Sequence, residues 1–194
     1  PSFHEMESVK NDINNRFLKI TSAIDLINIG DDYGLAHLLR QDPWLVYFRK
    51  NVTDNAYHPN GDDVPDYYGI RRGLSENPMI DGNSVLTENS VECWKDVQEG
   101  ETLLHIACRH ARTRAVQLLV DFGCDVNVPS LEPYYNTPLH IAAMADMREI
   151  IDILIKYNAT STSLNYLKET AFHCSCKVGA SNSSLKLIEK KLVY

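Results

Sequence analysis

One short pattern occurs three times in the second half of this 194-residue chain and constrains its fold more than any other feature. The pattern is Thr-x-x-His followed by small and apolar residues. It begins at Thr102, Thr137 and Thr170, so successive copies are 35 and 33 residues apart. Self-similarity at such a period is typical of a solenoid, in which each unit buries its apolar face against its neighbours. We therefore expect a stack of short helical units.

Each copy predicts a helix, a turn and a second helix. Threonine is a favoured N-cap, and Pro138 occupies a first helical position, where its missing N–H costs nothing. Gly123 and Asn158 stand where the second helix must end, and both residue types tolerate the left-handed conformation that ends a helix. Apolar residues about seventeen positions after each threonine mark the second helices: Val116, Leu118, Leu119 and Val120, then Ile150, Ile151, Ile153, Leu154 and Ile155, and more sparsely Leu185, Leu187 and Ile188.

The first unit carries further motifs that resemble an ankyrin repeat. They are Gly100-x-Thr-x-x-His105 and the ending Leu118-Leu119-x-x-x-Gly123-x-Asp-Val-Asn127. The resemblance covers roughly half of the chain and implies an all-α ankyrin-repeat solenoid. Its three units are residues 97–131, 132–164 and 165–194.

The later units depart from the family pattern at defined positions. The turn glycine of the first unit is replaced by Tyr135 in the second unit and by Lys168 in the third. Lys191 replaces the helix-ending glycine, and the apolar stripe of the third unit is thin. We interpret this last unit as divergent, being either a terminal cap or an incomplete repeat.

Residues 1–48 predict two helices in front of the repeats. Apolar residues every three or four positions indicate an amphipathic helix from about Glu5 to Ile29, which Gly30 ends. Asp31 or Asp32 can cap the next helix, which carries Leu35, Leu38 and Leu39 and stops at Pro43. The arrangement resembles a degenerate ankyrin unit without the Thr-x-x-His motif, which we interpret as an N-terminal capping repeat. The alternative is an unrelated helical hairpin packed on the same end.

Residues 49–96 predict a long, irregular, acidic insertion. Between residues 51 and 97 there are nine acidic and three basic residues, so this stretch carries six of the seven net negative charges of the chain. Its prolines and glycines disfavour a long helix. It also holds several aromatic and apolar residues, which is more than pure disorder requires. We expect it to order partly against the solenoid.

Composition narrows the class of protein. A net charge of −7 opposes binding to the phosphate backbone of nucleic acids. The sequence contains no apolar run long enough for a membrane span and no signal-peptide pattern. Five cysteines without regular spacing do not form a disulfide framework. We expect an intracellular protein, cytoplasmic or nuclear, with reduced cysteines.

The histidines and cysteines invite a catalytic or metal-binding hypothesis. His105, His140 and His173 occupy corresponding positions, one in each repeat, which favours a structural role next to the capping threonine. Within a helix, Cys174 and Cys176 point about 160–200° apart, so they cannot converge on one zinc ion. Buried cysteines are the expected alternative. The basic cluster at Arg109, His110, Arg112 and Arg114 is typical of a solvated helix end, and we predict no catalytic site, no metal and no cofactor.

The ankyrin resemblance implies a protein or peptide partner bound on the concave face of the array. In the family, this face is formed by the residue before each threonine and by two residues at the end of the first helix. We therefore predict a non-catalytic interaction module, as part of a larger adaptor or scaffold. The alternatives are a regulatory domain of a larger enzyme or channel and, from a likeness to Fem-type ubiquitin-ligase receptors, a substrate receptor. With Tyr134 added for its aromatic bulk, the predicted partner-binding residues are Glu101, Arg109, His110, Tyr134, Asn136, Met144, Ala145, Glu169, Lys177 and Val178.

Overall fold

The computed structural model describes residues 3–50, 97–98, 100–131 and 134–191, apart from the side chains of residues 3–10, 13, 190 and 191. In these ranges the regular structure is helical, apart from an isolated antiparallel bridge between Arg49 and Thr102. The fold is an all-α solenoid, as the repeats predicted. Residues 51–96 lie outside the described residues, so the expectation of an irregular insertion there stays a prediction.

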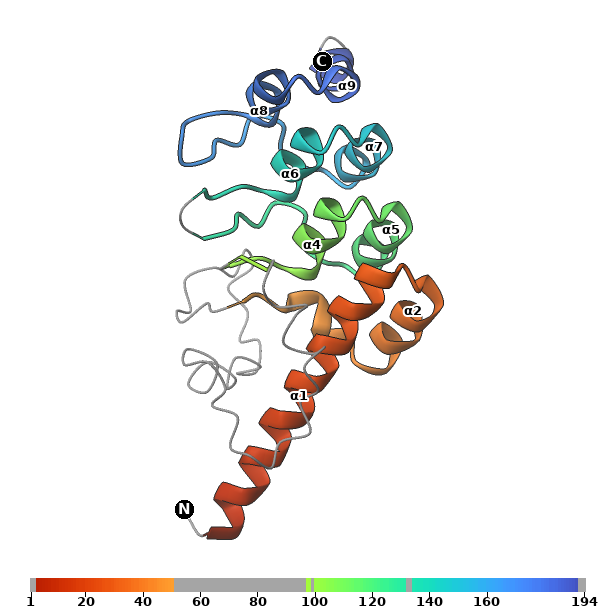
Figure 1. The fold of residues 1–194 in the computed structure, drawn as a ribbon, viewed down its shortest axis with the longest axis vertical. Helices are drawn as coiled ribbons and strands as arrows, with labels where there is room; N and C mark the ends of the chain where they lie inside the picture. Colours follow the sequence, from red (N-terminus) through yellow and green to blue (C-terminus); the bar gives the residue numbers. More distant parts are fainter. Residues whose placement is uncertain (1–2, 51–96, 99, 132–133, 192–194) are drawn as a thin grey trace.

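Three helical hairpins form the repeat array. In Figure 1 the first helices α4, α6 and α8 stack in one column, and the second helices α5, α7 and α9 stack in another. The connecting loops project beyond the first column. The hairpins are α4 (Leu103–Arg109) with α5 (Thr113–Asp121), α6 (Pro138–Met144) with α7 (Arg148–Lys156), and α8 (Ala171–Val178) with α9 (Ser181–Lys191).

The first helix of each hairpin begins at its threonine, as predicted. Thr102, Thr137 and Thr170 are N-caps with extended backbones, and the histidine three residues later completes a capping box. Each histidine accepts a hydrogen bond from the threonine N–H through Nδ1, at 3.1–3.2 Å. The imidazole thereby performs the task that glutamate performs in the usual capping box.

The turns within and between the units use the left-handed conformation. Gly123 and Asn158 adopt φ of 87° and 65° just after α5 and α7, which confirms the predicted helix ends. Gly100, Tyr135 and Lys168 adopt φ of 72°, 52° and 61°. Tyr135 and Lys168 therefore adopt the same left-handed backbone conformation as the turn glycine that they replace.

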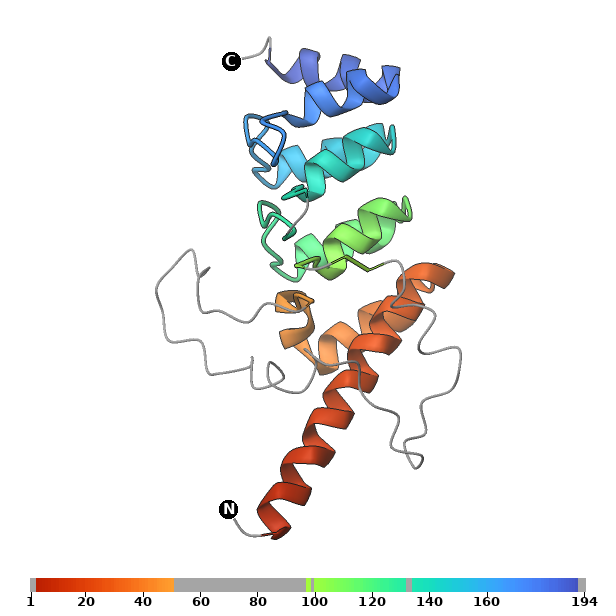
Figure 2. The same ribbon diagram turned by 60° about the vertical axis from the view of Figure 1, so that its left-hand side comes forward.

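A fourth helical pair precedes the repeats. It consists of α1 (Phe3–Ile29) and α2 (Asp32–Gln41), and a short 3₁₀ helix, η1 (Pro43–Tyr47), follows. Of the two predicted caps, Asp31 is the residue that caps α2, accepting a hydrogen bond from Gly34 N–H at 2.9 Å. The N-terminal half of α1 extends away from the stack (Figure 2).

This pair is in register with the repeats. Gly30 is left-handed, like Ala111, Asp146 and Gly179 at the corresponding turns. Thr21 precedes Gly30 by the same nine residues that separate Thr102 from Ala111. At Thr21, however, α1 continues without a break, and the Thr21 hydroxyl donates to Phe17 O at 2.9 Å. The N-terminal pair is thus a repeat-like unit whose capping motif is replaced by a longer helix.

One main-chain hydrogen bond recurs at the base of the loops. Ser130 N–H donates to Asn136 O and Asn165 N–H donates to Glu169 O at the base of two loops. Lys50 N–H donates to Glu101 O, at 2.9 Å, in the corresponding place. Lys50 and Glu101 therefore make, in front of the first repeat, the contact that closes the loops of the second and third repeats.

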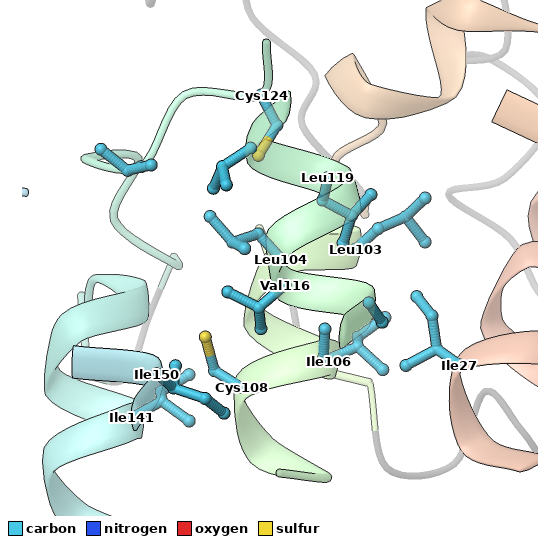
Figure 3. Packing of buried hydrophobic residues seen from close by; sticks show 14 of the residues in the cluster. Ile27, Leu103, Leu104, Ile106, Cys108, Val116, Leu119, Cys124, Ile141 and Ile150 are labelled. Atoms are coloured by element: carbon cyan, nitrogen blue, oxygen red, sulfur yellow. The ribbon is translucent and has the colours of Figure 1, made fainter. Parts of the chain in front are cut away.

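A continuous apolar core joins the units. Figure 3 shows Ile27 of α1 approaching the side chains of α4, and Ile141 and Ile150 of the second repeat approaching Cys108 of the first. These four side chains are buried. Burying an aliphatic side chain of this size contributes about 1.5–3 kcal/mol, so the interfaces between units carry much of the stability. The thin stripe of the third repeat is confirmed, because only Leu187 of its three predicted core residues is buried.

Candidate interaction surface

Corresponding residues of the three repeats form columns because the units stack in register. The residue before each threonine lies at the base of a loop, and the residue seven positions after the threonine lies near the C-terminal end of the first helix. In the first and third repeats these two positions form an ion pair. Arg109 Nη2 bonds to Glu101 Oε1, and Lys177 Nζ bonds to Glu169 Oε1 at 3.1 Å.

The second repeat replaces both members of this ion pair. Asn136 takes the place of the glutamate, and Met144 takes the place of the basic residue. Met144 is 37% exposed. The middle of the column is therefore an accessible, flexible thioether with an ion pair on either side.

Two of the predicted binding residues are buried and make contacts inside the chain. The Glu101 side chain is fully buried, and besides Arg109 it accepts from Gln98 N–H at 2.8 Å. Asn136 is 9% exposed, and its Oδ1 accepts from Asn165 Nδ2 at 3.2 Å. These residues position their neighbours and offer a partner little surface. The sequence analysis predicts both as partner-binding residues.

The remaining predicted residues are at least partly accessible. Tyr134 is 48% exposed at the tip of the second loop. His110, Lys177 and Val178 are exposed, whereas Arg109, Ala145 and Glu169 are partly buried. The Lys177 ammonium, which donates to Glu169, lowers the pKa of that carboxyl. Sequence reasoning did not single out three exposed apolar side chains of the third loop, Leu164, Tyr166 and Leu167.

The tips of the second and third loops contact each other. Tyr166 N–H donates to Tyr134 O at 2.9 Å, and the rings of Tyr135 and Tyr166 stack with centroids 6.4 Å apart. Tyr134 is left as the exposed aromatic ring of the second tip. The apolar character of residues 164–167 was the signal that could have extended the predicted surface to the third loop.

The histidines are structural in the first two repeats. Nδ1 of His105 accepts from Thr102 N–H, so the neutral ring carries its proton on Nε2 and donates to Asn136 O at 3.1 Å. His140 donates in the same way to Glu169 O at 3.1 Å. Burial lowers the pKa of His105 to about 4 and lowers the pKa of His140. Each ring thus joins its own helix start to the loop of the next unit.

Cys174 and Cys176 lie in different surroundings. Cys174 is buried, and its Sγ lies 3.5 Å from Asn165 Nδ2 and 3.7 Å from Glu169 Oε2. Cys176 is exposed and lies 3.6 Å from Ser184 Oγ, so the expectation that it would be buried was wrong. Its position faces the end of the stack, where no further unit covers it in the described structure. No group of three metal-ligating side chains occurs among the residues that the structure describes.

Burial makes the thiols of Cys108, Cys124 and Cys174 less acidic. It raises the pKa of Cys124 to about 12 and of Cys174 to about 11, and it raises the pKa of Cys108 further. A thiol with a raised pKa holds little of the reactive thiolate near neutral pH. These three cysteines therefore behave as small apolar residues.

The predicted basic cluster separates into different environments. Arg109 pairs with Glu101, whereas Arg112 Nη2 donates to Asn28 O at the end of α1. Arg112 thus holds the N-terminal helix against the first repeat. Arg114 is exposed. The cluster is not one continuous basic patch.

Comparison with known proteins agrees with this architecture. Residues 80–166 match a family model described as ankyrin repeats in three copies. The chain is 44% identical to neurogenic locus notch homolog protein 1 of Xenopus tropicalis over 61 residues, which are 31% of the chain and 2% of that protein. It is 39% identical to the human protein of that name over 96 residues, 47% of the chain and 4% of that protein. It is 29% identical to a putative ankyrin repeat protein of fowlpox virus over 148 residues, 58% of the chain and 25% of that protein.

Stacked helical hairpins with projecting loops define an α-solenoid with an extended surface on its loop side. The motifs, the capped hairpins and the matched family model show that the chain contains ankyrin repeats. The family match ends at residue 166, and α8 and α9 continue the same stack beyond it. The chain spans between 2% and 25% of the length of these curated relatives.

Ankyrin repeats are a non-catalytic fold that generally serves protein–protein interaction. None of the helices in the described ranges has the length and apolarity needed to cross a membrane.

Proposed function

We propose that this chain is a non-catalytic interaction module that binds a protein or peptide on the loop side of its repeats, within a larger adaptor or scaffold. Met144 carries the proposal. Its thioether is exposed at the midpoint of a column in which the equivalent positions hold ion-paired basic residues. An accessible methionine suits adaptable binding surfaces, because its unbranched side chain can adjust to an apolar partner.

The flanking ion pairs define the kind of partner that fits. Arg109 and Lys177 are already neutralised by Glu101 and Glu169. The surface therefore attracts a partner through an apolar anchor on Met144 more than through net charge. Tyr134 adds a second anchor at the loop tip, since an exposed tyrosine offers area and a hydroxyl at low entropic cost. His110, Ala145 and Val178 would border this contact, and Glu101 and Asn136 would support it from within.

The test compares matched surface substitutions. The immobilised chain is exposed to an extract of the cells that express it, and retained proteins are quantified for Met144→Glu and Tyr134→Ala. Both variants should lose most of the retained partner, by about tenfold or more for a hot-spot residue. Their thermal midpoints should stay within about 2 °C of the parent, because both side chains are exposed.

Two other exposed positions provide the controls. Leu185, on α9, is 59% exposed, and Tyr33, on α2, is 89% exposed. Leu185→Glu and Tyr33→Ala make the same chemical changes away from the proposed surface, and they should retain the partner. Equal loss in the test and control variants would refute binding at Met144. A fall in thermal midpoint together with lost binding would instead show that Met144 and Tyr134 support the fold.

A further inference from the structure

The second and third loops, which precede Thr137 and Thr170, project on the same side of the array (Figure 1). Two asparagine side chains join these loops at their base. Asn165 is 7% exposed, and its Nδ2 donates to Oδ1 of Asn136 at 3.2 Å. Ser130 takes the corresponding place in the second loop, and its hydroxyl accepts from Asn136 N–H of that same loop at 3.0 Å. The Asn165 side chain therefore reaches into the neighbouring repeat, whereas the Ser130 side chain binds within its own.

The orientation of the Asn165 amide is fixed by its own loop. Its Oδ1 accepts from Leu167 N–H and from Glu169 N–H, both at 3.0 Å. An amide oxygen that accepts two main-chain bonds leaves the NH₂ group on the other side, where it faces Asn136 and lies 3.5 Å from Cys174 Sγ. One side chain thus shapes the turn of the third loop and holds the second repeat.

The contact between the loop tips depends on this junction. Tyr166 directly follows Asn165, and its N–H donates to Tyr134 O at 2.9 Å. Tyr134 and Met144 are the two exposed side chains on which the proposed binding surface rests. Because Asn165 fixes the third loop, the bond from Tyr166 also fixes the second loop. The position of Tyr134 therefore depends on a buried residue of the next repeat.

We propose that Asn165 is a positioning residue for the surface formed by Met144 and Tyr134, because it holds the second loop in its binding conformation from within the third repeat. The inference rests on the function proposed above for that surface. A loop that spends part of its time in other conformations binds with an affinity reduced by that fraction. Losing the junction should therefore slow association, whereas losing a direct contact with a partner mainly speeds dissociation.

Two isosteric substitutions test the junction as a double-mutant cycle. In Asn136→Asp, the Asn165 amide still donates, now to a carboxylate. In Asn165→Asp, the carboxylate still accepts from Leu167 and Glu169 N–H, and the Asn136 amide can turn over so that its NH₂ group donates. Each single variant thus keeps the bond between the loops, whatever else it costs. The double variant places two carboxylates against each other and breaks the bond, so the excess over the two single effects isolates the junction.

Amide exchange of the full chain, measured residue by residue by NMR, tests the junction without a partner. We expect exchange at Tyr166 N–H to be about tenfold faster in the double variant than the product of the two single effects, because the released loop gives up its bond to Tyr134 O. Leu167 and Glu169, which keep their acceptor, should show no such excess. No excess at Tyr166, or an equal excess at all three amides, would overturn the proposal. If the double variant does not fold, Asn136→Ala removes the acceptor without adding charge and should also speed exchange at Tyr166.

The binding role is tested with peptides selected on the parent chain from a random displayed library and kept if both Met144→Glu and Tyr134→Ala reject them. For such a peptide, the association rate constant of the double variant should be about tenfold lower than the single effects together predict, and the dissociation rate constant should change by less than about threefold. Unchanged association despite faster exchange at Tyr166 would overturn the positioning role and leave the proposed function intact. Failure to obtain any such peptide would count against the Met144 surface itself, and therefore against both proposals.

Discussion

The first and third repeats carry the same Thr-x-x-His motif in different surroundings. His105 is fully buried and uses both ring nitrogens, one for its own helix start and one for the loop of the second repeat. His173 is exposed, and among the described residues its hydrogen bonds are to Thr170 alone. The motif therefore specifies a helix start wherever it occurs. Its contribution to the stability of the array depends on whether a neighbouring unit covers it, as expected for a quasi-one-dimensional fold.

Replacing His105 and His173 by alanine, one at a time, should give the largest difference in the free energy of unfolding. His105→Ala deprives Thr102 N–H and Asn136 O of buried hydrogen bonds and leaves a cavity, so we expect a loss of about 3–4 kcal/mol in the free energy of unfolding. His173→Ala removes only the capping contact and should cost about 1 kcal/mol. Urea unfolding of both variants measures the difference. Similar losses would show that the interface between repeats adds little to the value of the motif.

The loop turns provide a second contrast between the two repeats. Gly100 has φ of 72°, and a Cβ placed on it would lie 2.4 Å from the main-chain nitrogen of Leu131. Gly100→Ala therefore combines backbone strain with a clash against main chain, and should cost about 2–3 kcal/mol. Thermal or urea unfolding of this variant gives the value. A cost below about 0.5 kcal/mol would mean that the loop of the first repeat can move away from Leu131.

Lower pH should weaken the interior repeats through their histidines. The folded-state pKa of His105 is about 4, below the ordinary value of 6.5, so the unfolded state binds a proton first as the pH falls. The stabilisation that depends on neutral His105 is then fully present above about pH 7 and is lost between about pH 6.5 and 4. At pH 5 this loss lowers the free energy of unfolding by roughly 2 kcal/mol. Lowered pKa values at Asp146 and Glu169 act in the same direction, but in the lower range in which carboxyl groups titrate.

The matched variant for this pH dependence is His105→Gln, which cannot titrate. Unfolding by urea at pH 7 and at pH 5 should show a smaller difference for this variant than for the parent. His140, whose pKa is also lowered by burial, contributes to the difference that remains. An unchanged difference would assign the pH sensitivity to groups other than His105.

Local signals in the sequence predicted the elements of the fold. A threonine, a histidine and a left-handed residue act through contacts within a few positions, so the helix starts and the ends at Gly123 and Asn158 could be predicted. The register of the N-terminal pair at Thr21 could not, because its helix continues through that position and the sequence lacks the histidine. The helical pair itself was predicted from its apolar spacing and from Gly30.

The orientation of individual surface residues was harder to predict. Glu101 is buried and forms an ion pair with Arg109. Asn136 accepts a side-chain hydrogen bond from Asn165, which is 29 residues away. The sequence alone does not show that these partners meet. Cys176 was expected to be buried because the corresponding Cys108 and Ala143 positions suit burial, but in the third repeat no following unit covers it. Whether a residue of a solenoid is buried depends on the neighbouring units, and a motif within one unit carries no information about those units.

The smallest expected effect concerns the turn of the third repeat, where Lys168 occupies the position of Gly100. Lys168 has φ of 61° and its side chain is exposed, so its Cβ adds strain without adding a core contact. Lys168→Gly should relieve that strain while making the unfolded chain more flexible. Because these terms oppose each other, we expect a net gain of about 0.5 kcal/mol or less. Tyr135→Gly is the informative control, since it relieves similar strain but also removes the stacking on Tyr166, and should be destabilising. If differential scanning calorimetry shows Lys168→Gly to be as destabilising as Gly100→Ala, the third loop depends on its lysine side chain, and the contrast between the two turns is wrong.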